Sequence, residues 1–123
     1  MQLAGHGFVY HFPDDFDDRA AVEMTDKEYV AGGAVELPGR GRYPVAFFTP
    51  TRLRQELALM TQQGEAVLTE PGLAVIAEVT PDAILRAVPE LIRQGFFDHL
   101  KPLTAPVVNG ASGPATVSSA VGR

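Results

Sequence analysis

The sequence predicts an α+β fold in which two main helices cover one face of an antiparallel sheet of four to five strands. Segments 49–64 and 80–95 are similar at an offset of 31 residues: both have a Thr-Pro start, apolar residues at matching helical positions and a Gln-Gly end. Each follows an apolar, strand-like run that a Pro-Gly turn precedes. Because short turns join only antiparallel strands, the pattern predicts two ββα units, 28–64 and 66–95.

The N-terminal part is expected to contribute one strand and one short helix. Residues 7–12 are aromatic and typical of a strand. The sequence Pro13-Asp14-Asp15 is typical of a helix start, because carboxylates cap the first turn and interact favourably with the helix dipole. This helix is expected to end near residue 24.

The first ββα unit is expected to contain a strand, a turn, a return strand and a helix. The Gly32-Gly33 pair in the first strand indicates a bulge or a close backbone approach. Thr49 is a good N-cap, and Gly64 suits the left-handed residue that ends a helix. The expected elements are a strand at 28–37, a turn at 38–41, a strand at 43–48 and a helix from Pro50 to about Gln62, with Leu53, Leu57 and Met60 buried.

The second unit is expected to repeat this order with strands at 66–69 and 73–79 and a helix from Pro81 to about Gln94. Thr80 is its predicted N-cap. Pro89 removes one backbone hydrogen bond and is expected to kink or split this helix. From residue 104 the chain is small, polar and uncharged until Arg123, so we expect a single domain over 1–103 and a C-terminal tail over 104–123.

Composition excludes several classes of function. The 123 residues include no cysteine, which excludes disulfides and thiolate chemistry. The formal charge of −5 argues against nucleic-acid binding. Apolar runs are too short for a membrane span of about 18 residues or more. No basic and apolar leader is visible at the N-terminus. We therefore expect a cytoplasmic protein with no membrane association.

The charges are segregated along the chain. Residues 14–28 hold seven acidic and two basic residues, whereas 36–54 hold four arginines and one glutamate. Arginine binds carboxylate and phosphate groups in a bidentate manner, and a helix N-terminus offers further N–H donors. The candidate site for an anion or an acidic partner comprises Arg40, Arg42, Arg52 and Arg54. The alternative is that they are solvated surface residues, with the acidic segment as their complement within the molecule or across a dimer.

A second candidate site is a metal centre formed by His11, Asp14 and Asp15. The alternative is a capped helix start with solvated carboxylates. A third candidate is an apolar partner surface at Phe96, Phe97 and Leu100, for which the alternative is a place in the core.

The inventory of catalytic residues is nearly empty. No serine or cysteine occurs between residues 1 and 111, so a nucleophile would have to come from the tail. The sequence also lacks a phosphate-binding loop, a dinucleotide glycine fingerprint and a His-Glu-x-x-His motif. We predict no catalytic residues and no cofactor.

Residues 43–91 resemble the N-terminal domain of SseB-type bacterial proteins. The resemblance consists of Pro44-Val45, then Phe47-Phe48-Thr49-Pro50 leading into a helix at Leu53, then Val67-Leu68 before Pro71-Gly72, and finally Thr80-Pro81 opening the next helix. It implies a small α+β module without catalytic residues.

These observations predict a non-catalytic protein-interaction or regulatory module of a bacterial cytoplasmic protein, with a protein partner or a homo-oligomeric state. The alternative is a domain that binds a small anion or a metal, with or without enzymatic activity. It would use Arg40, Arg42 and Arg52, or His11 with the two aspartates that follow it.

Overall fold

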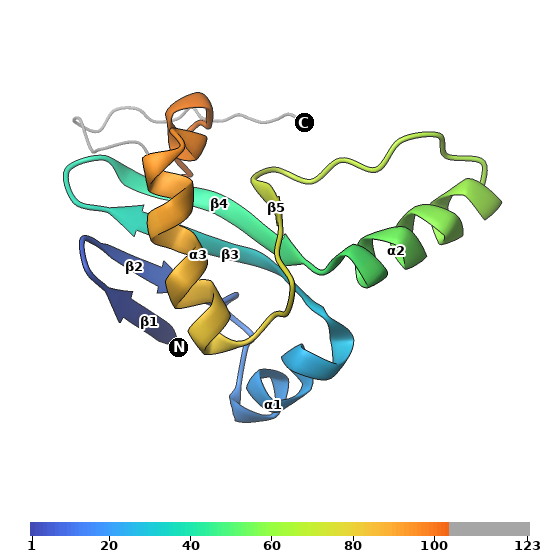
Figure 1. The fold of residues 1–123 in the computed structure, drawn as a ribbon, viewed down its shortest axis with the longest axis horizontal. Helices are drawn as coiled ribbons and strands as arrows, with labels where there is room; N and C mark the ends of the chain where they lie inside the picture. Colours follow the sequence, from blue (N-terminus) through green and yellow to red (C-terminus); the bar gives the residue numbers. More distant parts are fainter. Residues whose placement is uncertain (104–123) are drawn as a thin grey trace.

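The computed structural model describes residues 1–103, and the expected tail at 104–123 lies outside them. The fold is α+β, as predicted, with a five-stranded sheet and three α-helices (Figure 1). The elements are β1 (Gln2–Gly5), β2 (Phe8–His11), α1 (Asp18–Lys27), β3 (Tyr29–Leu37), β4 (Gly41–Phe48), α2 (Pro50–Gln62), β5 (Leu73–Val75), α3 (Pro81–Arg93) and the 3-10 helix η1 (Phe96–His99).

The sheet is mixed rather than antiparallel throughout. Its strand order is β1-β2-β3-β4-β5. The first four strands pair antiparallel, whereas β5 pairs parallel with β4. The parallel pair requires a crossover connection, which is supplied by α2 and the segment that follows it.

The N-terminal hairpin was not expected. Strand β1 pairs with β2 through a two-residue connection, His6-Gly7. Gly7 has a φ of 84°, a conformation that glycine adopts without steric cost. The His6-Gly7 dipeptide directly before an aromatic strand could have indicated this hairpin.

The Gly32-Gly33 prediction is confirmed. The register between β3 and β4 shifts between Val30 and Gly33, as expected for a bulge. A Cβ atom on Gly33 would lie 2.3 Å from the Tyr10 hydroxyl oxygen, so the glycine also permits a close approach.

The second ββα unit is not formed, and this prediction is wrong. Residues 66–69 form no strand, and only the three residues of β5 join the sheet after the Pro71-Gly72 turn. The amide of Ala46 donates a 2.9 Å hydrogen bond to the carbonyl of Gly72, which brings this turn against β4. Residues 66–69 have strand propensity, but no strand of the sheet pairs with them.

The helix boundaries follow the capping residues. The Thr49 and Thr80 hydroxyls accept hydrogen bonds from the amides of Arg52 and Ala83, as predicted. The start expected at Pro13 is wrong, because Asp17 caps α1 instead. Helix α3 runs without a break through Pro89, so the expected split is absent.

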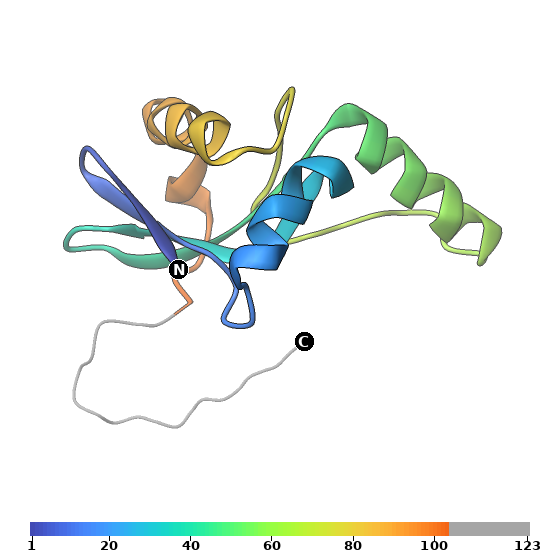
Figure 2. The ribbon, with the colours of Figure 1, turned by 90° about the horizontal axis from the view of Figure 1, so that it is seen from below.

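Only α3 lies across the sheet in the way expected for both main helices. It covers one face, while α2 extends beyond the end of the sheet (Figures 1 and 2). The core lies between the sheet, α1, α3 and η1. Its largest fully buried side chains are Tyr10, Phe47, Phe97, Met24, Ile84, Val35, Val45, Val79 and Val88.

Tyr10 carries a polar atom into this core. Its ring packs edge-on against Phe12 at 4.9 Å, and its hydroxyl has no hydrogen-bond partner among the described residues. Burial raises the pKa of Tyr10 above its ordinary value. A buried hydroxyl without a partner costs free energy that a phenylalanine would not.

We expect Tyr10→Phe to raise the free energy of unfolding by about 1 kcal/mol, measured by urea denaturation at pH 7. The wild type should also lose stability above pH 10, because the unfolded chain ionises there while the folded Tyr10 stays neutral. The variant should show a shallower decline, since it lacks this buried phenol. If the variant is no more stable than the wild type at neutral pH, the Tyr10 hydroxyl is not an unpaired buried group.

Candidate protein-interaction surface

The four arginines of the candidate anion site do not form one cluster. Arg40 lies in the turn that joins β3 to β4 and Arg42 lies at the start of β4, whereas Arg52 and Arg54 lie on α2 beyond the other end of β4. The eight residues of β4 extend for roughly 25 Å. The combined site of Arg40, Arg42 and Arg52 is therefore not assembled.

The two arginines at the turn contact acidic side chains of the same chain. Arg40 donates to the Asp98 carboxylate at 2.7 Å and its guanidinium lies 5.5 Å from the centre of the Tyr43 ring. The hydrogen bond to Asp98 raises the pKa of Arg40. Arg42 lies 3.7 Å from the Glu36 carboxylate. Both arginines at this end of the sheet are therefore paired with carboxylates of the same chain.

The candidate metal ligands are also separated. The Nε2 atom of His11 lies 2.7 Å from the Glu36 carboxylate, on the neighbouring strand. Asp14 and Asp15 are exposed in the turn that follows β2. Within residues 1–103 no group of three or more histidine and acidic side chains could hold a metal ion. The proposed metal centre is therefore not formed.

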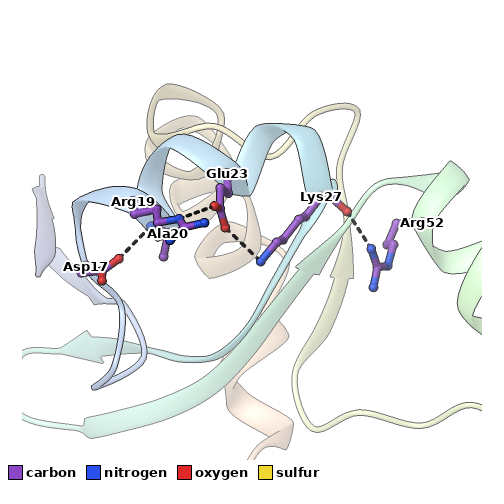
Figure 3. A network of polar contacts seen from close by, with 6 residues as sticks. All are labelled: Asp17, Arg19, Ala20, Glu23, Lys27 and Arg52. Carbon is purple, nitrogen blue, oxygen red and sulfur yellow. Dashed lines mark hydrogen bonds and ion pairs between the residues drawn. The ribbon is translucent and has the colours of Figure 1, made fainter.

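Two side chains of the acidic segment, Asp17 and Glu23, form contacts within α1 and its N-cap (Figure 3). Glu23 lies between Arg19 at 2.9 Å and Lys27 at 3.2 Å, and hydrogen bonds from these two residues lower the pKa of Glu23. The carbonyl of Lys27 accepts a 3.2 Å hydrogen bond from Arg52, which links the end of α1 to the start of α2.

The predicted apolar partner surface belongs mainly to the core. Phe97 is only 2% exposed, and its ring packs against those of Tyr43 and Phe96. Phe96 and Leu100 are half-buried and pack against the same core. Phe97 is therefore not available to a partner, and the core alternative holds for it.

The first turn of α2 is firmly anchored. The buried Thr49 donates its hydroxyl proton to the Glu28 carboxylate at 2.9 Å. Arg52 lies over the Tyr29 ring at 4.2 Å and pairs with Glu56 at 2.6 Å. These contacts fix where the helix starts and in which direction it leaves the sheet.

The rest of α2 has no comparable support. None of its 13 residues is buried, so the expected burial of Leu53, Leu57 and Met60 is wrong. Leu57 is 43% exposed, and Leu53 and Met60 are half-buried. Figure 2 shows the helix projecting past the sheet, with the returning segment beside it. We call the stripe of Leu53, Leu57 and Met60 the α2 face.

The apolar stripe of the corresponding helix α3 is buried against the sheet. Ile84 and Val88 occupy the positions that match Leu53 and Leu57, and both are completely buried. A helix that joins two parallel strands ordinarily packs back onto the sheet. An isolated helix shorter than about 12–15 residues is also marginally stable in water. The α2 face therefore has the composition of a contact surface, but no element of the described chain buries it.

A groove lies between the outermost strand of the sheet and α3. Its volume is about 670 Å³, and one side is formed by β5 and the residues that follow it. The other side is a stripe of α3 that includes Arg86, Ala87 and Glu90. Val75, at the end of β5, is 48% exposed beside it. Sequence reasoning missed this groove because it predicted two strands, at 66–69 and 73–79, where only β5 forms.

No family model matches this chain, and neither curated proteins nor solved structures give a significant match. Among the helices of residues 1–103, none is both long enough and apolar enough to span a bilayer.

Proposed function

We propose that this protein is a non-catalytic protein-interaction module and that the α2 face is its principal contact surface. The observation that carries the proposal is that a 13-residue helix with an apolar stripe has no buried residue. Apolar surface removed from water contributes about 25 cal/mol per Å². A partner that covers this stripe is therefore stabilised by apolar burial, with little loss of conformational entropy in the helix.

The anchored first turn supports the same role. Because Thr49 and Arg52 hold the start of α2 against the sheet, the helix is presented in a fixed direction. A preorganised contact surface loses less conformational entropy on binding than a flexible one. We propose that the module works in the bacterial cytoplasm, in line with the resemblance of residues 43–91 to the N-terminal domain of SseB-type proteins.

The variant Leu57→Glu tests this function. In an extract of cells that express the tagged full-length chain, the wild type should elute in size-exclusion chromatography well above its monomer mass of 13.2 kDa. Leu57→Glu should shift it to the monomer position, because a charge in an apolar contact is costly. The matched control is Ala58→Glu, which points away from the stripe.

Far-UV circular dichroism spectra of the two purified variants should be the same, because both positions are exposed and neither substitution removes a buried contact. Elution of the wild type as a monomer, or equal behaviour of the two variants in the extract, would overturn the proposed function.

A further inference from the structure

We propose that the partner of the α2 face is a second copy of this chain, and that α2 of each copy lies in the groove beside β5 and α3 of the other. This inference rests on the proposed function and names its partner. A reciprocal arrangement uses each surface twice and closes as a two-fold dimer.

The two surfaces have compatible chemistry. The α2 face presents two leucines and a methionine, and most of the residues that line the groove are apolar. A helix that lays an apolar stripe into an apolar groove is a common mode of protein recognition. The apolar lining residues include Ala74, Ile76, Ala83, Ala87, Leu91 and Phe96.

The dimensions are also compatible. The α3 side of the groove extends from Ala83 to Gln94, which is about 17 Å along a helix. The stripe from Leu53 to Met60 spans about 11 Å. The stripe therefore fits within the length of the groove.

The charges around the two surfaces are complementary. The charged residues that line the groove are Glu78, Arg86 and Glu90, with one net negative charge. The charged residues of α2 are Arg52, Arg54 and Glu56, with one net positive charge. Arg54 and Glu78 form no ion pair within residues 1–103. We infer that these two side chains lie near each other at the rim of the contact.

One chain cannot bring its own surfaces together in this fold. The start of α2 is held at the end of α1 by hydrogen bonds from Thr49 and Arg52 to the carbonyls of Glu28 and Lys27. The helix points away from α3 (Figures 1 and 2). A second copy brings the helix to the groove without any change in the fold of either chain.

Disulfide trapping tests the contact directly, because the native chain has no cysteine. Two single-cysteine variants of the full chain are prepared, Leu57→Cys on α2 and Ala87→Cys in the groove. Mixed in equal amounts, allowed to exchange subunits and oxidised, they should form a disulfide-linked dimer. Neither variant alone should do so. Crosslinking of Leu57→Cys with itself would indicate a helix-to-helix dimer and would overturn the proposal.

Sedimentation velocity of the purified wild type supplies the second measurement. The expected species is a dimer whose dissociation constant rises at least about 30-fold in Leu57→Glu. Arg54→Glu should weaken the dimer about fivefold, and the double variant Arg54→Glu/Glu78→Arg should recover most of that loss. A monomer at all concentrations, or assemblies larger than a dimer, would overturn the proposal.

These outcomes separate the inference from the proposed function. If the purified protein is a monomer while the wild type in the extract is large and Leu57→Glu is not, the α2 face binds a different protein. The inference then fails and the proposed function stands. If neither sample associates, both fail.

Discussion

Replacing Phe97 with alanine will lower the free energy of unfolding by about 3–5 kcal/mol. The side chain is 2% exposed and contacts the rings of Tyr43 and Phe96, so its removal leaves a cavity between η1 and the sheet. Native domains have only about 5–15 kcal/mol of stability. The thermal midpoint should therefore fall by about 4–8 °C for each kcal/mol lost, as measured by circular dichroism.

The matched control is Phe96→Ala, because Phe96 is a half-buried neighbour of the same type. It should cost clearly less, since part of its ring already contacts water. A partner-surface role for Phe97 would give the opposite pattern: Phe97→Ala would keep its thermal midpoint and lose only association. That result would show that η1 does not pack against the sheet through Phe97.

Replacing Gly72 with alanine will lower the free energy of unfolding by about 3 kcal/mol or more. Gly72 has a φ of 70°, and an added Cβ would lie 2.0 Å from the carbonyl oxygen of Pro44. The clash is with backbone, so no side chain can move aside. Relief requires β5 to shift away from β4, which breaks the 2.9 Å hydrogen bond from the Ala46 amide.

Gly39→Ala is the matched control for this substitution. Gly39 has a φ of 75°, and a Cβ added there would have no other atom within 4 Å. Alanine at this position therefore meets only the conformational penalty of about 1–2 kcal/mol. Urea denaturation of both variants isolates the steric cost as the difference between them. Equal costs would mean that Gly72 is not pressed against β4 and that β5 is paired differently.

Local capping chemistry explains the parts of the fold that the sequence predicted well. The hydroxyls of Thr49 and Thr80 accept hydrogen bonds from amides in the first turns of their own helices. The sequence pattern that predicts each cap therefore involves the same few residues as the cap itself. The bulge at Gly32-Gly33 is similarly local. The start of α1 was placed wrongly because four aspartates could each act as a cap, and only Asp17 has its side chain at the Ala20 amide.

Pairing between distant segments explains what could not be predicted. Residues 66–69 have the composition of a strand, but the place beside β4 is taken by β5, whose approach depends on the contact between Gly72 and Pro44. The similarity between the two Thr-Pro helices likewise identified an apolar stripe on each. It could not tell that α3 buries its stripe under its own sheet whereas α2 points away from it.

The α2 face was not predicted as a site, because its three apolar residues were expected to be buried. The sequence located Leu53, Leu57 and Met60 as one helical face, which is a property of spacing alone. Whether that face is covered depends on the direction in which α2 leaves β4, which is set by Thr49, Glu28 and Tyr29. The arginines were grouped by sequence proximity, although β4 separates them into two pairs.

Site-specific photocrosslinking along α2 in living cells determines whether another protein covers the α2 face. A photoreactive amino acid is placed in turn at Leu53, Leu57 and Met60, and in matched controls away from the stripe, which are Gln55, Ala58 and Gln62. We expect protein crosslinks from the first set only. Crosslinks from neither set, or equally from both, would contradict a contact through the α2 face.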